Sequence, residues 1–84
     1  MSPALPVVSG QETVTALGKI GFEQVGQRGS HVKLRDQEGR MVIVPNHREL
    51  ARGALSAILR QSGVTVSQFI DLLEETSSLE GCLT

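Results

Sequence analysis

The residues best suited to chemistry in this chain are Gly29, Ser30 and His31, which follow one another directly. Histidine has an ordinary pKa that lets it exchange protons near neutral pH, so it can serve as a general acid or a general base. The glycine and serine favour a turn that presents the imidazole, and the serine hydroxyl can donate to an anionic oxygen. Basic residues flank this corner: Arg28, Lys33 and Arg35. A histidine at the start of a strand is often purely structural, so the residues alone leave both roles open.

A second polar group follows further along the chain, where His47, Arg48 and Arg52 occur close together. His47 can act as a second acid or base, or it can simply contact the backbone at the start of the next helix. Neither histidine has acidic neighbours at metal-ligand spacing, and the single cysteine, Cys82, allows neither a disulfide nor a zinc site. We therefore expect no metal and no cofactor.

The composition is that of one small globular domain. The 84 residues are 39% hydrophobic and 20% charged, a balance typical of a folded chain. There is no Trp or Tyr and there are only 2 Phe, which argues against binding single-stranded nucleic acid on aromatic stacking platforms. No signal peptide and no apolar run of membrane-spanning length is visible, so we expect a cytoplasmic protein without membrane contact.

The formal net charge of −1 conceals an uneven distribution of charge. Residues 28–60 carry seven Lys or Arg and three Asp or Glu, whereas residues 61–84 carry four acidic residues and no basic one. The middle of the chain therefore suits an anionic partner, although the overall basicity usual for a dedicated nucleic-acid binder is missing.

Local signals divide the chain into six elements. Ser9 with Glu12, and Thr65 with Gln68, are capping boxes that predict the starts of two helices. Gly26 is expected to weaken or bulge the strand that contains it. We expect a helix over 10–19, strands over 22–27, 31–35 and 40–44, and helices over 53–62 and from the second capping box to about 75.

The strand over 31–35 alternates clearly. Val32 and Leu34 share one face, and the other face carries the candidate site residues His31, Lys33 and Arg35. The strand over 40–44 is apolar on both faces, so we place it in the centre of the sheet, with the following proline ending it.

The predicted order is α-β-β-β-α-α, an α+β fold in one domain. Strands joined by short turns pair antiparallel, and the helices are expected to cover one face of a three-stranded sheet. We expect residues 1–8 to form an extended lead-in, 9–75 the folded core and 76–84 a flexible tail.

Several segments together resemble the HicA toxins, also described as YcfA-like proteins, of the HicAB toxin–antitoxin systems. The resemblance covers roughly residues 9–69. It rests on Gly21-Phe22-Glu23, on Arg28-Gly29-Ser30-His31, on a hairpin into Val44-Pro45-Asn46-His47, and on a helical segment containing Arg52-Gly53-Ala54-Leu55 and Ile58-Leu59. This chain differs from the family in its slightly acidic net charge and its longer acidic end.

The resemblance implies a double-stranded-RNA-binding-domain-like fold and a ribonuclease that cuts mRNA independently of the ribosome. It implies that His31 is the active residue and that a HicB antitoxin covers the face carrying it. In such cleavage a base removes the proton of the 2′-hydroxyl that attacks the phosphodiester, and an acid protonates the leaving oxygen.

We therefore predict an endoribonuclease toxin in which His31 is catalytic. The residues expected to bind RNA are Arg28, Gly29, Ser30, Lys33, Arg35, His47, Arg48 and Arg52. Two alternatives stay open on the residues alone. The first is a non-catalytic RNA-binding module that uses the same face, and the second is a protein-interaction domain that uses the apolar third strand and the acidic last helix.

Overall fold

The computed structural model describes residues 5–83, with the backbone alone described over 75–83. Its elements are α1 (Gly10–Gly18), β1 (Glu23–Arg28), β2 (His31–Arg35), β3 (Met41–Pro45), α2 (Arg52–Ser62) and α3 (Val66–Leu83). The strands form one antiparallel sheet in the order β1-β2-β3. The predicted α-β-β-β-α-α order and the α+β class are confirmed.

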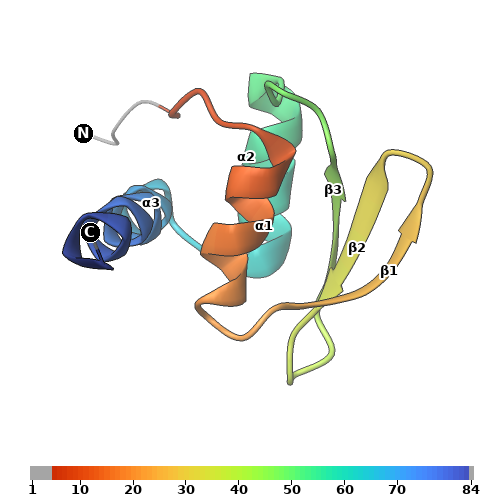
Figure 1. Ribbon diagram of the computed structural model, residues 1–84. Helices are drawn as coiled ribbons and strands as arrows, with labels where there is room; N and C mark the ends of the chain where they lie inside the picture. Colours follow the sequence, from red (N-terminus) through yellow and green to blue (C-terminus); the bar gives the residue numbers. More distant parts are fainter. Residues whose placement is uncertain (1–4, 84) are drawn as a thin grey trace.

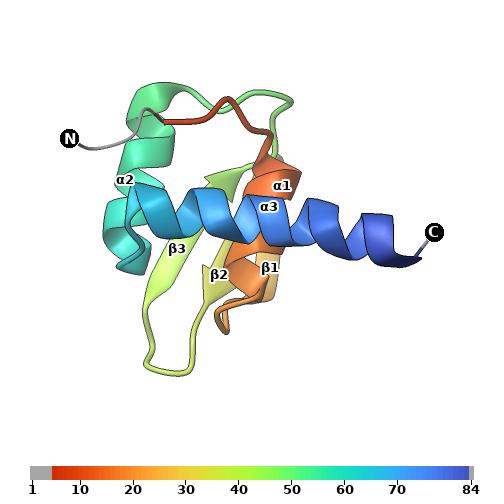
Figure 2. The same cartoon turned by 90° about the vertical axis from the view of Figure 1, so that its left-hand side faces the viewer.

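The elements are stacked in layers. Helices α1 and α2 lie side by side against one face of the sheet, and α3 packs against α1 on the side away from the sheet (Figure 1). Figure 2, turned by a quarter, shows α3 running across the front of α1 and α2. No helix among the described residues covers the other face of the sheet, which we call the outer face.

The core between the sheet and the helices is aliphatic, with two phenylalanines. Alternate residues of β2 and β3 point into it, as their spacing predicts. It contains Val32, Leu34, Val42 and Val44 from the sheet, Ala16 and Leu17 from α1, Leu55, Ile58 and Leu59 from α2, and Val8, Phe22, Leu50, Val64 and Phe69. Burial of this apolar surface stabilises the fold, and it requires all three helices to be in place.

The position of β3 corrects one expectation. β2 pairs with both other strands, so β3 lies at an edge of the sheet and not in its centre. Short turns join each strand to the next, so β2 lies between β1 and β3 even though β3 has apolar side chains on both faces. The apolar residues on its second face therefore stay exposed, Met41 at 46% and Ile43 at 49%. Pro45 belongs to the strand, where its missing N–H is tolerated at an edge.

The ends of several elements also differ from the expectations. α3 continues to Leu83, so the expected helix end near residue 75 is wrong. Val8 of the expected lead-in is buried in the core, and its carbonyl accepts a hydrogen bond from the Leu50 amide at 2.8 Å. Residues 1–4 and 84 lie outside the described residues, and the flexible tail over 76–84 stays a prediction.

Both capping boxes are confirmed. The Ser9 hydroxyl accepts from the Glu12 amide at 3.0 Å, and the Glu12 carboxylate accepts from the Ser9 amide at 2.9 Å. At the start of α3 the Thr65 hydroxyl accepts from the Gln68 amide at 3.1 Å, and the Gln68 side chain accepts from the Thr65 amide at 3.0 Å. These bonds satisfy amides that a helix leaves without partners in its first turn.

Candidate functional site

The corner before His31 is a tight hairpin turn. Arg28 at the end of β1 pairs with His31 at the start of β2, so only Gly29 and Ser30 lie between the strands. Gly29 has a φ of 59°, whereas Ser30 has a negative φ. A positive φ at the first central residue alone is the pattern of a type II′ turn, which favours glycine there. The turn fixes where the His31 backbone lies.

A β-bulge in β1 sets which residues share the outer face. The pairing of β1 with β2 shifts between Gln24 and Gly26, so Val25 is an extra residue without a partner. Residues paired across a sheet point to the same face, which places Arg28 beside His31 on the outer face. With strict alternation from Gln24, Arg28 would point to the face of the sheet that packs against the helices. The bulge therefore brings its guanidinium to the candidate site.

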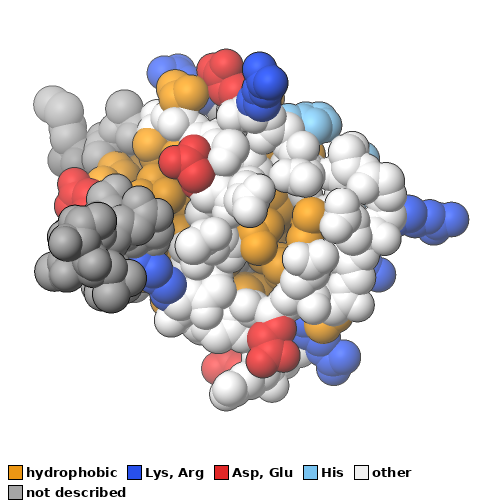
Figure 3. Space-filling view, in the orientation of Figure 1, with side chains coloured by type: hydrophobic (Ala, Val, Ile, Leu, Met, Phe, Trp, Pro, Cys, Tyr) orange, Lys and Arg blue, Asp and Glu red, His pale blue; other side chains and the backbone are white. Residues whose placement is uncertain are grey.

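The outer face has His31, Lys33 and Arg35 along its middle strand. Their alternation with buried Val32 and Leu34 is confirmed. Across the sheet, these three residues face Pro45, Ile43 and Met41 of β3 respectively. In Figure 3, basic side chains project on the side of the molecule where the sheet lies, with histidine near them at the top. The outer face thus combines positive charge with exposed apolar surface.

A hollow of about 560 Å³ opens on this face. Its lining consists of Val25, Gly26, Gln27, Arg28, His31, Lys33 and Ile43. Gly26 is paired with Lys33, and a Cβ atom added to Gly26 would meet no atom within 4 Å. The missing side chain therefore leaves space beside Lys33, with Val25 on the β1 side of the hollow and Ile43 on the β3 side.

The charged groups of the hollow are unpaired within the described part of the chain. The structure gives the imidazole of His31 no hydrogen-bond partner there, and Arg28 and Lys33 contact no carboxylate. Arg40 is the one basic residue of the described part that forms ion pairs, with Asp36 and Glu38. The positive charge around the hollow is thus available to an anionic ligand.

The loop that carries His47 and Arg48 is held next to the hairpin turn. The Asn46 amide donates to the Ser30 carbonyl at 2.5 Å, and the Gly10 amide donates to the His47 carbonyl at 2.8 Å. The His47 and Arg48 side chains are exposed and do not line the hollow. A Cβ on Gly10 would collide with the Pro45 carbonyl oxygen, so close packing by α1 fixes this loop.

The structure therefore divides the predicted RNA-binding set. It brings Arg28, His31 and Lys33 into one hollow. Arg35 lies on the same face outside the hollow, and Arg52 is exposed in the first turn of α2. Gly29 and Ser30 form the turn itself. Whether each of these residues binds RNA stays a prediction.

Sequence reasoning missed the uncharged part of the lining: Val25, Gly26, Gln27 and Ile43. A signal existed for Gly26, because a glycine inside a strand often marks a bulge or a close approach of another group, and the bulge was expected. For Ile43 the signal was its apolar side chain on the second face of β3. The prediction attributed that side chain to a central position of the strand and not to a binding surface.

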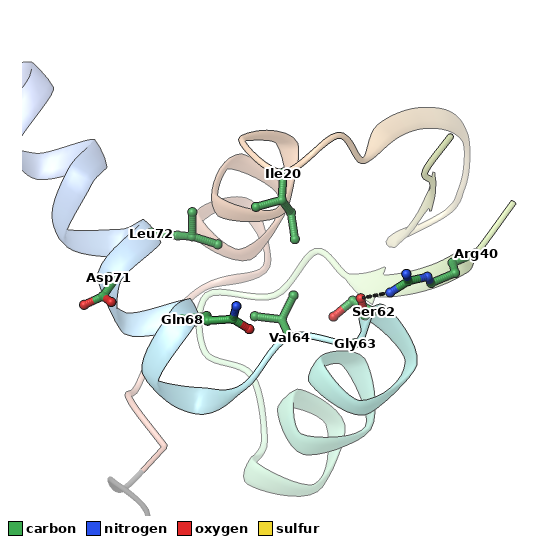
Figure 4. Close-up of a pocket in the computed structure, with 8 residues that line it drawn as sticks. All are labelled: Ile20, Arg40, Ser62, Gly63, Val64, Gln68, Asp71 and Leu72. Carbon is green, nitrogen blue, oxygen red and sulfur yellow. Dashed lines mark hydrogen bonds between the residues drawn. The ribbon is translucent and has the colours of Figure 1, made fainter. Parts of the chain in front are cut away.

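A second hollow, of about 380 Å³, lies between the end of α1, the end of α2 and the start of α3 (Figure 4). Arg40 reaches into it and donates from Nη1 to the Ser62 carbonyl at 3.0 Å. A hydrogen bond from Arg40 to Glu38, together with the charge of Glu38, raises the pKa of Arg40, which stays protonated. This arrangement ties the β2–β3 turn to the end of α2, where carbonyl groups lack helical partners, and its role is structural.

Among the residues whose side chains the structure describes, 5–74, no group of three or more His, Cys, Asp or Glu is arranged to hold a metal ion. The helices over residues 5–83 include none with the length and apolar character needed to cross a membrane.

Comparison with protein-family models identifies the family of this chain. The protein-family model described as the HicA toxin of bacterial toxin–antitoxin systems matches residues 10–64, which is more than half of the chain. A search of curated proteins finds no match. The matched residues run from the start of α1 to the second residue after α2 and include every residue of the hollow.

Proposed function

The chain belongs to the HicA toxin family of bacterial toxin–antitoxin systems, and on this premise we propose that it is an endoribonuclease that cleaves mRNA with His31 as its acid–base residue. The observation that carries the proposal is the hollow on the outer face. Within the part of the chain that the structure describes, this hollow holds an imidazole with no protein partner beside two unpaired basic side chains, Arg28 and Lys33.

The proposed reaction is attack by a 2′-hydroxyl on the adjacent phosphodiester. The imidazole of His31 accepts the hydroxyl proton as the 2′-oxygen bonds to phosphorus, and the bond from phosphorus to the 5′-oxygen breaks. The departing oxygen takes a proton from water, which reaches the open hollow. Positioned proton transfer of this kind contributes about 10²–10⁴-fold to the rate.

Arg28 and Lys33 have a separate role in this proposal. They hold the RNA backbone beside His31 and stabilise the negative charge that develops on the phosphoryl oxygens. Arg28 is suited to this role because its planar guanidinium can bind two phosphate oxygens at once. Gly29 and Ser30 place the ribose-phosphate at the turn, and Arg35, His47, Arg48 and Arg52 extend the contact to neighbouring phosphates.

The partner in this proposal is a HicB-type antitoxin that covers the outer face. That face presents exposed Met41 and Ile43 beside unpaired basic residues, and an interface of mixed apolar and acidic character would complement it. The antitoxin would then inhibit the toxin by excluding RNA from His31. We place the protein in the cytoplasm, where its mRNA substrate is found.

The test compares two histidine variants of the purified protein on RNA. His31→Ala should lower the cleavage rate by about 10²–10⁴-fold. His47→Ala is the matched control, because its side chain is also exposed but lies outside the hollow, and it should keep most of the activity. Circular dichroism checks that both variants fold. Cleavage by folded His31→Ala at the wild-type rate would reject the proposed role.

A non-catalytic RNA-binding module is a second candidate. One observation favours it. Among the residues that line the hollow, His31 is the one histidine, and none is an aspartate or glutamate. Under this reading the protein binds RNA through Arg28 and Lys33 without cleaving it, and His31→Ala leaves the affinity nearly unchanged. Product analysis of RNA after incubation with the wild-type protein separates the two candidates.

A further inference from the structure

The hollow has a feature that backbone cleavage alone does not require, which is the apolar side chains in its lining. Val25 and Ile43 are 51% and 49% exposed, and they line the same space as the basic residues. Resting on the proposed function, we propose that the space above Gly26 holds one unstacked nucleobase of single-stranded RNA, next to the phosphate at His31.

The lining fits a nucleobase. The flat face of a base is apolar and suits Val25 and Ile43, whereas its edge carries acceptor groups that suit Lys33, which pairs with Gly26, while Arg28 beside His31 holds the phosphate. The volume of about 560 Å³ lies in the range of sites that hold small molecules, about 300–1,000 Å³. The phosphate attached to the same nucleotide would meet the positive charge on the adjacent side of the hollow.

Gly26 itself indicates that the empty space matters. Its φ is not positive, since the described glycines with positive φ are Gly21, Gly29, Gly39 and Gly63. No neighbouring atom would contact an added Cβ, so packing does not require glycine there either. Glycine inside a strand weakens the strand because it offers no side chain to pack and loses more conformational freedom on folding. Gly26 directly follows the bulged residue Val25, but neither a positive φ nor packing requires glycine there, and an open hollow gives the absent side chain a use.

The geometry favours a single strand over a duplex. A base in a duplex is paired and stacked, and it cannot enter a hollow on a protein surface without leaving its helix. Proteins that recognise duplex RNA by shape contact the backbone and the minor groove, and they need no pocket for one base. Because the hollow has no aromatic side chain, it suits one inserted base and not a run of stacked bases.

The experiment uses short 2′-fluoro RNA strands, which lack the attacking hydroxyl and stay intact during a binding measurement. One base is removed at each position in turn, and affinity is measured by fluorescence anisotropy. For the wild-type protein, removal at one position should weaken binding about tenfold, which is the usual effect of losing one base contact. A paired duplex of the same sequence should bind more weakly than the single strand.

The decisive variant is Gly26→Val, which fills the hollow with a side chain that strands accept. It should remain at least as stable as the wild type, bind the intact strand about tenfold more weakly and lose the sensitivity to base removal. Gly53→Ala is the matched control, because an added Cβ at Gly53 likewise meets no atom within 4 Å, but Gly53 lies on α2, away from the hollow. This variant should bind as the wild type does.

The outcomes separate the two proposals. A wild-type protein that cleaves RNA and has no base-sensitive position overturns the base site alone, as does Gly26→Val with unchanged binding and unchanged sensitivity. A wild-type protein that neither binds nor cleaves RNA overturns the proposed function and the base site with it.

Discussion

At the residue scale, the site depends on which charged groups are already neutralised. Arg40 is held by Asp36 and Glu38 and by the Ser62 carbonyl, so it contributes little to the field over the outer face. Arg28 has no such partner within the described residues and lines the hollow. Two arginines of the same charge therefore differ in their availability to RNA, a difference that composition does not reveal.

One prediction follows for Arg28. Arg28→Ala should weaken RNA binding. It should also make the fall of the log binding constant with log salt concentration less steep by roughly 0.7, the value for one lost phosphate contact to a single strand. Arg60→Ala removes the same charge from an exposed position on α2 and should change neither quantity appreciably. Binding titrations at several salt concentrations measure both effects, and equal losses in the two variants would indicate that net charge alone drives binding.

At the element scale, the hairpin and the following loop are positioned by contacts that extend well beyond β1 and β2. The Gly10 amide at the start of α1 donates to the loop at His47, and the Asn46 amide donates to the turn at Ser30. Helix α1 thus supports the loop, and the loop supports the turn that presents His31. A change at the start of α1 is expected to affect the site without touching it.

A pair of glycines in α1 tests this support. Gly10→Ala places a Cβ against the Pro45 carbonyl oxygen and should destabilise the fold by about 1–3 kcal/mol, the usual result of overpacking. Gly18→Ala in the same helix meets open space and should stabilise it by about 0.5–1 kcal/mol. Urea denaturation gives the free energy of unfolding of both variants. Equal values for the two would contradict the close packing of α1 on the loop.

At the scale of the whole molecule, α3 is part of the domain although the family match ends at residue 64. Phe69 of α3 is fully buried in the core, and α3 packs against α1 on the side away from the sheet. The Lys19 ammonium also donates to the Leu72 carbonyl at 3.2 Å, which joins the end of α1 to α3. The helix layer that supports the sheet is therefore completed by a segment outside the matched region.

Truncation of Phe69 tests that role. Phe69→Ala should lower the free energy of unfolding by about 3–5 kcal/mol, because it removes a large side chain that is 0% exposed. Val7→Ala removes apolar atoms from a side chain that is 76% exposed and should change stability by less than about 0.5 kcal/mol. Thermal and urea unfolding measure both, and a small effect at Phe69 would show that α3 is dispensable to the fold.

Features that depend on near neighbours along the chain could be predicted from the sequence. The two capping boxes, the alternation of β2, the glycine at the hairpin turn and the order of the elements all arise from contacts within a few residues. The same local signals located His31 with Arg28 and Lys33, and the family pattern gave His31 its predicted role.

The way in which the strands and helices combine is visible only in the folded molecule. Pairing placed β3 at the edge and left Ile43 exposed, and the bulge at Val25 turned Arg28 toward the face of His31. Neither result can be read from one strand alone, because register and strand order depend on the strands with which it pairs. The hollow over Gly26 exists because three strands each contribute part of its lining, so no single stretch of sequence contains it.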